Sequence, residues 1–346
     1  MNWSSSLGAF TQRMIRVEAP ADVGEARRQA QDAAAQIGLC EAKSGQLALA
    51  VTEAGSNIVK HARAGTILIR ALSAEGSSGI EILALDKGPG MVDVALSMRD
   101  GYSTAGTPGT GLGALSRVTE QLEIYSRSGL GTALRFEVRN GQRRNERDAV
   151  DIGAVCVPMP GEVACGDAWA IADDDGRQVI LVVDGLGHGP EAASAAHAAL
   201  NALRCNLPTS SALDALGTIH EALRGTRGAA GSIAILDLSQ RRGSYCGIGN
   251  ISCATRASAT TRQMISYNGI LGHQTRTMNA VDFEFPADAL LIAHSDGLNT
   301  HWRFDAYPGL ERHHPALVAG VLYRDHARGR DDATCIVVRC AKGGRS

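Results

Sequence analysis

The chain has 346 residues, of which 44% are hydrophobic and 20% charged, and its formal net charge is −2. This length suggests two domains, and the composition excludes a globally disordered chain. The sequence contains neither an apolar stretch of about 18 residues nor a basic block, so we expect no membrane span and no nucleic-acid partner. It shows no secretion signal and no C-x-x-C pair among its eight cysteines, which predicts a cytoplasmic protein with reduced thiols.

The first half of the chain shows strand and helix patterns that predict a layered α/β sandwich. Its best-defined helix, Glu41–His61, carries an apolar stripe at positions i, i+4, i+7 and i+11. The other predicted elements are, in chain order, a strand at Arg13–Val17, a helix at Ala21–Ile37, strands at Thr66–Leu72 and Gly79–Asp86, a helix at Thr110–Gln121 and strands at Leu122–Ser126 and Thr132–Val138.

Two polar residues stand out on the predicted helix Glu41–His61. Glu53 and Asn57 are four residues apart and therefore share one face. A carboxylate and an amide oxygen aimed into one cavity are suitable ligands for Mg²⁺ and a water molecule. The alternative is an ordinary solvated helix face.

A turn-like motif, Asp86-Lys87-Gly88-Pro89-Gly90, follows the predicted strand Gly79–Asp86. A carboxylate at a strand end can accept a hydrogen bond from the amino group of adenine. Gly88 and Gly90 allow the backbone to pass close to a base. In isolation, the motif could also be a simple Pro-Gly turn.

A glycine-rich segment opens the next predicted helix, with glycines at positions 109, 111 and 113. Backbone N–H groups at a helix N-terminus can cradle phosphate, so Gly109, Gly111 and Gly113 are candidate phosphate ligands. A dinucleotide-binding fingerprint is rejected because this segment follows the polar loop Arg99–Pro108 and not a strand.

These three motifs, in this order and spacing, resemble the GHKL ATPase fold over residues 12–138, and within it the RsbW/RsbT-type serine kinases. The resemblance implies that Glu53 is a general base or orients water, that Asn57 binds Mg²⁺, and that Asp86 recognises adenine. It further implies that Gly88 and Gly90 shape the base pocket, and that Gly109, Gly111 and Gly113 hold the phosphates of ATP under a lid at about residues 98–108. Lys87 departs from the family pattern, in which a small or acidic residue is more usual.

The polar segment Arg139–Asp148 lies between two strand-like runs and predicts a linker. We therefore expect domains at residues 1–140 and 150–346, joined by residues 141–149. In the second half, short apolar runs bounded by Gly or Asp predict two sheets, and Ala-rich segments predict flanking helices. The predicted strands are Ala154–Val157, Val179–Val183, Ser232–Leu236, Ala289–Ala293 and Thr334–Val338, and the predicted helices are Pro190–Asn206 and Ser211–Arg224.

Aspartates recur at the ends of these apolar runs, next to glycine. They are Asp167, Asp184, Asp296 and the pair Asp331–Asp332. Several carboxylates gathered at one end of a β-sandwich would repel one another unless a cation neutralised them, and two ions about 4 Å apart can activate water against a phosphoryl group. A single Asp-Gly pair is more often just a turn.

Residues 150–341 resemble the SpoIIE/RsbX/RsbU branch of the metal-dependent (PPM-type) serine/threonine phosphatases. The matching motifs are Gly166-Asp167, Asp184–Gly189, Gly247–Asn250, Ser295–Gly297 and Asp331–Thr334. The resemblance implies that Asp184 bridges two Mn²⁺ or Mg²⁺ ions with the carbonyl of Gly185 as a further ligand. Asp296 and Asp331 would complete one metal site, and Asp167 would serve the other.

The two resemblances together predict an α/β (α+β) chain: a GHKL-type α/β sandwich followed by a PPM-type β-sandwich flanked by helices. They imply a phosphatase fused to an ATP-binding, RsbT-like kinase domain, with phosphorylated STAS-domain antagonists or stressosome proteins as substrates and a homodimer as one expected assembly. The alternative is a phosphatase whose first domain only binds ATP or a partner. A purely regulatory protein with two inactive sites is disfavoured by the full set of aspartates.

Overall fold

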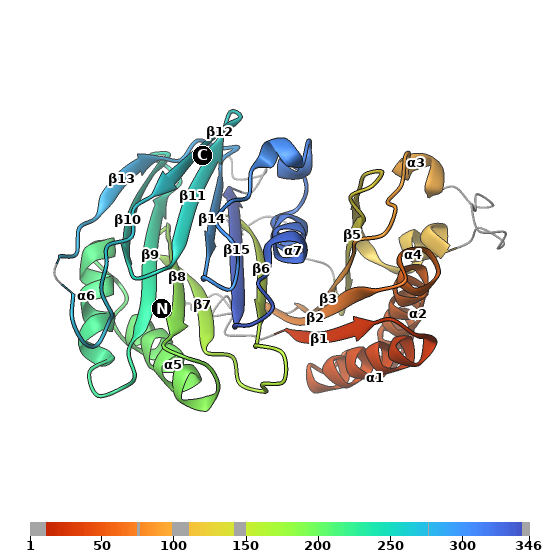
Figure 1. Ribbon diagram of the computed structural model, residues 1–346, viewed down its shortest axis with the longest axis horizontal. Coiled ribbons are helices and arrows are strands. Elements are labelled where there is room, and N and C mark those ends of the chain that lie inside the picture. The colour runs from red at the N-terminus through yellow and green to blue at the C-terminus, as the bar shows by residue number, and fades with distance from the viewer. Residues whose placement is uncertain (1–11, 75–76, 99–110, 142–149, 276, 341–346) are drawn as a thin grey trace. The chain divides into compact units, whose positions relative to one another are not determined.

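The computed structural model describes residues 12–74, 77–98, 111–141, 150–275, 277–340 (Figure 1). The described chain forms two compact units. The N-terminal unit comprises residues of Gln12–Asn145 together with Arg312–Arg324, and the C-terminal unit comprises residues of Glu146–Glu311 and Asp325–Ser346. None of the described helices is long and apolar enough to cross a membrane. The eight cysteines all lie in described segments and are free thiols.

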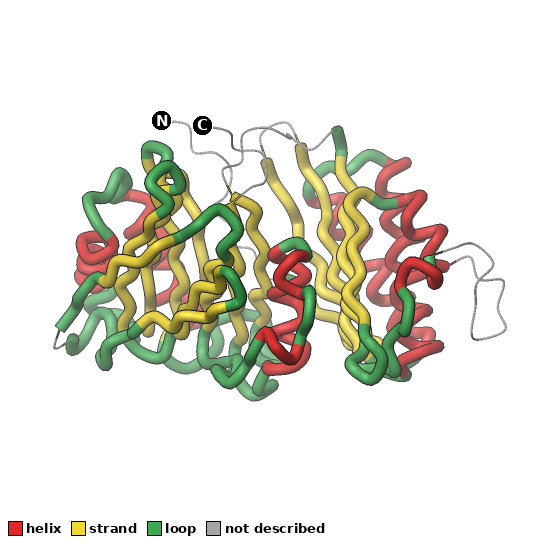
Figure 2. The backbone as a smooth tube through the Cα atoms, turned by 90° about the horizontal axis from the view of Figure 1, so that it is seen from above, coloured by secondary structure: helices red, strands yellow, loops and turns green. Residues whose placement is uncertain are grey.

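The N-terminal unit is built on a five-stranded antiparallel sheet in the order β1-β2-β3-β5-β4. The helices from the first half of the sequence cover one face of this sheet (Figure 2), and the predicted apolar stripe from Leu47 to Ile58 is buried there. The strands are β1 (Arg13–Val17), β2 (Gly65–Ala74), β3 (Ser77–Asp86), β4 (Glu120–Ser126) and β5 (Thr132–Arg139), and the helices are α1 (Pro20–Gln36), α2 (Glu41–Asn57) with a π-helical turn at Ile58–Ala62, α3 (Val94–Ser97) and α4 (Gly111–Val118).

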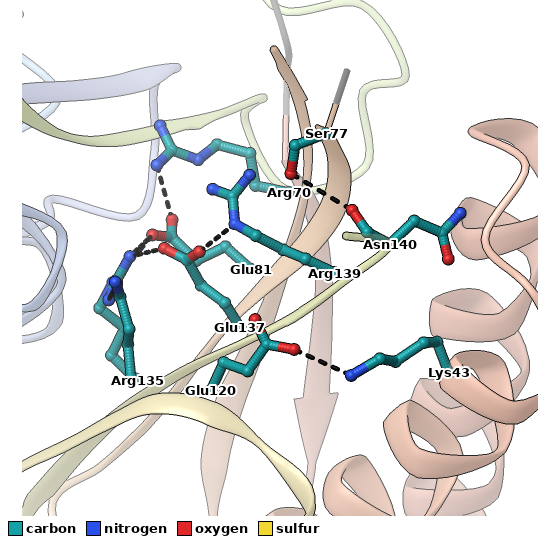
Figure 3. A network of polar contacts seen from close by, with 10 residues as sticks. Lys43, Arg70, Ser77, Glu81, Glu120, Arg135, Glu137, Arg139 and Asn140 are labelled. Carbon is teal, nitrogen blue, oxygen red and sulfur yellow. Dashed lines mark hydrogen bonds and ion pairs between the residues drawn. The ribbon is translucent and has the colours of Figure 1, made fainter. Parts of the chain in front are cut away.

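The opposite face of the same sheet contains a buried ladder of alternating charges (Figure 3). Glu81 on β3 pairs with Arg70 on β2 and with Arg135 on β5, and Glu137 on β5 pairs with Arg135 and Arg139. Every charge has an opposite partner, which offsets the cost of removing these groups from water.

A helix from the second half of the sequence, α7 (Pro315–His326), contributes most of its length to the N-terminal unit. Its residues from Pro315 to Leu322 are all buried. Gly320 allows close approach to β3, because a Cβ atom there would lie 3.2 Å from Leu85 and 3.4 Å from Leu83. The chain therefore places part of its second half against the first sheet.

The C-terminal unit contains two five-stranded antiparallel sheets that share an apolar core, and α5 (Pro190–Cys205) and α6 (Ala212–Ala222) pack on the first of them (Figure 1). The first sheet has the order β13 (Val281–Glu284), β10 (Arg242–Ile248), β9 (Ala229–Asp237), β8 (Arg177–Gly185), β7 (Asp167–Asp174). The second has the order β12 (Thr260–Met264), β11 (Ser252–Ala257), β14 (Leu290–His294), β15 (Ala333–Cys340), β6 (Val150–Val157).

The predicted fold class is confirmed: both units are layered α/β structures with antiparallel sheets. The predicted helix Thr110–Gln121 is too long, because α4 ends at Val118 and β4 begins at Glu120 with an irregular register against β5. Strands β10 to β13 and helix α7 were not predicted. The proposed boundary at residues 141–149 falls almost wholly outside the described residues and stays a prediction.

Candidate functional sites

The carboxylate site begins at two neighbouring strands of the C-terminal unit. Asp167 is the first residue of β7, and Asp184 is the penultimate residue of β8; the antiparallel register places them directly opposite each other. Asp167 is buried, whereas Asp184 is half-buried. The apolar run Val179–Val183 anchors β8 in the core, so its carboxylate is held at a fixed strand end.

Ser295 links this pair to the second sheet. Its hydroxyl donates to Asp167 Oδ2 at 2.6 Å and accepts from the backbone N–H of Thr334 at 3.0 Å. The backbone N–H of Ser295 also donates to the carbonyl of Thr334. One buried serine therefore joins β7, the end of β14 and the start of β15, which brings Asp296 and Asp331 to the same end of the β-sandwich.

Asp331 and Asp332 have different surroundings. Asp332 is 2% exposed, and its two oxygens accept from the backbone N–H groups of Met159 (2.7 Å) and Gly166 (2.8 Å). Position 166 must be glycine here, because a Cβ atom would lie 2.8 Å from Asp332 Oδ2. Asp332 thus clamps two loops together, whereas Asp331 is half-buried beside it.

Two further contacts complete the rim of the site. The side-chain amide of Asn250 donates to Asp296 Oδ2 at 2.8 Å. The Nδ1 atom of His188 lies 2.8 Å from Glu162 Oε1, at the exposed end of the turn Asp184–Gly189. The turn itself is fixed at Gly185, where a Cβ atom would lie 2.2 Å from the carbonyl oxygen of Ala192.

The carboxylates raise one another's pKa values. Burial, followed by the charges of Asp167, Asp296, Asp331 and Asp332, raises the pKa of Asp184 to about 9. Burial also raises the pKa of Asp167 to about 7, despite the hydrogen bond from Ser295. Burial and the charges of Asp296 and Asp332 raise the pKa of Asp331. Such repulsion is the environment that a bound cation relieves.

The donor set fits a divalent cation in its chemistry. Asp167 Oδ1 is buried without a hydrogen-bond partner, and an unsatisfied buried carboxylate oxygen is costly unless something binds it. Hard divalent cations prefer such oxygens. Across the part of the chain that the structure describes, however, no three Asp, Glu, His or Cys side chains lie close enough together to hold an ion unaided. Backbone carbonyls or water would have to complete the coordination.

In the N-terminal unit, α2 carries Glu53 and Asn57 as predicted. Both side chains are half-buried, and Asn57 is the last residue of α2, just before the π-helical turn Ile58–Ala62. The intervening Ala54 and Gly55 are buried. Ala54 and Gly55 therefore face the core, whereas Glu53, Ser56 and Asn57 remain partly accessible.

The turn after β3 is tightly packed around Asp86. Its Oδ1 atom accepts from the backbone N–H groups of Gly88 (2.8 Å) and Thr132 (3.2 Å), while burial raises its pKa. Gly88 packs against Ala62, and Gly90 has φ +69°, with space for a Cβ atom blocked by the carbonyl of Arg127 at 1.9 Å. The two predicted glycines are thus required by the backbone itself.

The predicted phosphate loop is only partly described. Helix α4 begins at Gly111 and packs against α2, with Gly113 in its first turn and Leu115 in the core. Gly109 and residues 99–108 of the predicted lid lie outside the described residues. The structure therefore packs α4 against the helix that carries Glu53 and Asn57.

The roles of several residues of these sites were not predicted from the sequence. Ser295 and Asp332 appear in the predicted motifs beside the proposed metal ligands, but their supporting contacts were not predicted, and their burial between apolar strands was the available signal. Arg324 donates from Nη1 to the carbonyl oxygen of Asp86 at 3.1 Å, and no sequence pattern indicated this contact. Its partner is 238 residues away in the sequence.

Comparison with known proteins agrees with both halves of this description. Residues 17–138 match the family described as histidine kinase-like ATPase domain, and residues 174–341 match stage II sporulation protein E (SpoIIE). The serine/threonine-protein kinase RsbT of Bacillus subtilis (strain 168) is 31% identical over 123 residues, which are 36% of this chain and 92% of RsbT.

The phosphoserine phosphatase RsbX of the same organism is 27% identical over 140 residues, which are 40% of this chain and 70% of RsbX. A solved structure reported as "The bacterial stressosome: a modular system that has been adapted to control secondary messenger signaling" shares 27% identity with a TM-score of 0.52. The alignment covers 56% of this chain and all of that one.

The fold and the matches together define a class of protein in which an ATPase-type domain is fused to a PPM-type serine/threonine phosphatase domain. The chain belongs, through its N-terminal half, to the RsbT family of histidine kinase-like ATPases, and its C-terminal half is a phosphatase domain of the SpoIIE/RsbX type.

Proposed function

We propose that the C-terminal unit hydrolyses phosphoserine or phosphothreonine in a protein substrate with the help of two Mn²⁺ or Mg²⁺ ions. Asp184 would hold the two ions, with the carbonyl of Gly185 as a further ligand. Asp296 and Asp331 would complete one site, and Asp167 would serve the other. The observation that carries this proposal is the buried, unpartnered Oδ1 atom of Asp167, directly opposite Asp184.

The neighbouring residues of this chain would hold the ligands in place. Ser295 fixes Asp167 through Oδ2 and leaves Oδ1 for an ion, while Asn250 orients Asp296. When bound, two divalent ions lower the pKa of water and hold a phosphoryl oxygen. The exposed His188 lies in the turn Asp184–Gly189 and is oriented by Glu162. From there it would contact the phosphoprotein or the departing hydroxyl group.

The decisive experiment measures phosphate release from a phosphoserine-carrying STAS-domain protein while the concentration of free Mn²⁺ is varied. We expect no turnover in the presence of a chelator and saturable activation by Mn²⁺. Full activity in chelator would refute the proposal. Mg²⁺ in place of Mn²⁺ tests which ion supports faster turnover.

We propose, as a second activity, that the N-terminal unit binds Mg·ATP. Asn57 would bind the metal, Asp86 would accept from the adenine amino group, and Gly88 with Gly90 would shape the base pocket. The phosphates would lie at Gly109, Gly111 and Gly113, and Glu53 would orient the attacking hydroxyl group of a protein substrate. The supporting observation is the fixed carboxyl group of Asp86 at the end of β3.

Whether this unit transfers phosphate is tested by incubating the full chain with labelled ATP and an unphosphorylated STAS-domain protein. Label in the protein that disappears in Glu53→Gln supports a kinase. Nucleotide binding without label supports the alternative, an ATP-binding or partner-binding module. The substrate assignment rests on the relation to RsbT, RsbX and a stressosome structure, and a homodimer stays a prediction.

A further inference from the structure

Helix α7 lies, in the sequence, between two residues of the carboxylate site. Asp296 precedes it and Asp331 follows it, yet residues Arg312–Arg324 belong to the N-terminal unit. The chain therefore leaves the unit that contains the proposed metal ligands at Arg312, contributes residues Arg312–Arg324 to the proposed nucleotide-binding unit, and returns at Asp325. This connection is covalent, so it persists in every state of the protein.

Several specific contacts hold α7 to the N-terminal sheet. Glu123 on β4 accepts from His313 Nδ1 (3.2 Å) and from the backbone N–H of His314 (2.9 Å), just before the helix. Near its other end, the hydroxyl of Tyr323 donates to Met14 Sδ at 3.1 Å. With the close approach of Gly320 to β3, these contacts fix both ends and the middle of the helix.

Arg324 connects α7 to the proposed adenine-binding residue. Its guanidinium donates to the carbonyl oxygen of Asp86, the same residue whose Oδ1 accepts from Gly88 and Thr132. Because backbone and carboxyl group belong to one residue, a shift of the Asp86 peptide would move the carboxyl group. The proposed base pocket is thus supported by a side chain from the second half of the chain.

The C-terminal end of α7 is tied equally firmly to the loop that carries Asp296. The backbone N–H of Asn299 donates to the carbonyl of His326 (2.9 Å), and that of Arg328 donates to the carbonyl of Gly297 (2.8 Å). A short β-bridge joins Leu298 to Ala327. Only glycine fits at position 297, since a Cβ atom there would lie 2.0 Å from the carbonyl oxygen of Asp332.

From this continuous set of contacts we propose that α7 completes the nucleotide-binding unit, that Arg324 is a positioning residue for Asp86, and that α7 links nucleotide binding to metal binding at Asp296 and Asp331. The inference rests on the two proposed binding activities. Linkage of this kind is reciprocal: if nucleotide changes the affinity for the metal, the metal changes the affinity for nucleotide by the same factor.

The first test measures nucleotide affinity in the full chain by calorimetric titration with Mg·ATP. Arg324→Ala should weaken binding about 3- to 30-fold, the range usual for residues that couple two sites. Arg324→Lys should recover part of this loss, because an ammonium group can still donate to the carbonyl. Tyr323→Phe is the matched control: it removes a different α7 contact, to Met14, and should bind ATP as the wild type does.

The second test measures linkage. The free Mn²⁺ concentration that gives half-maximal phosphatase activity is determined with and without a saturating non-hydrolysable ATP analogue, with free metal set by a chelating buffer. The analogue should shift this midpoint at least about threefold in the wild type and not in Arg324→Ala. Melting temperatures of all variants, measured in parallel, separate a positioning role from loss of folding.

The outcomes distinguish this inference from the proposed function. If the wild type binds ATP and requires Mn²⁺, but Arg324→Ala binds ATP unchanged and the analogue leaves the Mn²⁺ midpoint unmoved, the role of α7 is refuted and both activities stand. If the wild type binds no ATP, the proposed nucleotide site itself fails. A general loss of thermal stability in Arg324→Ala without rescue by Arg324→Lys would also count against positioning.

Discussion

The proposed base-pocket turn of the N-terminal unit and the carboxylate site of the C-terminal unit are assembled in opposite ways. In the first, the turn from Asp86 to Gly90 comes from one short stretch of sequence, and its shape depends on backbone packing at glycines. In the second, the carboxylates come from strand ends that lie as far apart in the sequence as Asp167 and Asp331. The conformation of the Asp86–Gly90 turn depends on the space available around its glycines, whereas the carboxylate site is dominated by repulsion between like charges.

This difference has a consequence for stability. A tightly packed turn contributes to the folded state whether or not a ligand is present. A cluster of carboxylates that raise one another's pKa values weakens the folded state until a cation binds. Substitutions at the two sites should therefore have opposite relations between activity and stability.

The largest expected effect concerns activity at the carboxylate site. Asp184→Asn removes the proposed bridging ligand and should lower phosphatase turnover about 10²- to 10⁴-fold, since metal ions contribute several kcal/mol to such reactions. Because it also removes a charge from the cluster, the metal-free variant should unfold at the same or a higher temperature than the wild type. Phosphate release and thermal unfolding in chelator measure both quantities; a variant that is inactive because it is unfolded contradicts the charge argument.

The nucleotide turn should show the reverse relation. Gly90→Ala places a Cβ atom against the carbonyl of Arg127 at a φ of +69°, which should lower the free energy of unfolding by about 2–4 kcal/mol and weaken ATP binding. Gly129→Ala is the matched control, since it also has positive φ (+78°) but no atom within 4 Å, and should cost only about 1–2 kcal/mol. Urea unfolding of both variants measures the difference, and equal losses would show that space at Gly90 is not limiting.

Substitution of Ser295 should affect both stability and metal binding, because its hydroxyl group is buried between two strands and also holds the Asp167 carboxylate. Ser295→Ala leaves the N–H of Thr334 and an oxygen of Asp167 without their partner, at a cost of about 1–3 kcal/mol for each buried group. We expect a lower unfolding temperature and a higher Mn²⁺ requirement. Ser266→Ala, which loses hydrogen bonds to Tyr245 and Ile251 instead, should lower stability without changing the Mn²⁺ requirement.

The local site was the easier of the two to predict in detail. The sequence predicted the Asp86–Gly90 turn because glycine and proline mark turns directly, and the structure has this turn at the end of β3, whereas its role in binding a base stays a prediction. The aspartates were found because each follows or precedes an apolar strand. The supporting roles of Ser295 and Asp332 were not predicted, because a hydrogen bond between residues 128 positions apart, such as that from Ser295 to Asp167, leaves no local pattern.

Helix α7 shows the limit of sequence reasoning most clearly. Its residues from Pro315 to Leu322 are buried, so the segment has no polar face and no helical period that distinguishes core from surface. Its membership of the N-terminal unit depends on partners such as Leu83 and Glu123, and even the nearer of these, Glu123, precedes its partner His314 by 191 residues. The order of the motifs along the chain suggested that each half would fold from its own segment alone. Nothing in the sequence indicates that Arg312–Arg324 belong to the N-terminal unit.

The smallest expected effect concerns the contact that holds the start of α7. Burial would raise the pKa of Glu123, but hydrogen bonds from His313 and from the N–H of His314, with the charge of Arg135, outweigh burial and lower it. A lowered carboxyl pKa stabilises the folded state above the pKa of the unfolded chain, about 4.3, and this contribution is lost as pH falls through the lower folded value. Glu123→Gln keeps an acceptor oxygen but loses the charge, so it should cost about 0.5–1 kcal/mol at neutral pH, and this cost should decline as the pH falls through the lowered folded pKa of Glu123. Urea unfolding from pH 7 to pH 3.5 measures the difference, and a penalty that persists unchanged at low pH would show that the charge of Glu123 does not hold α7.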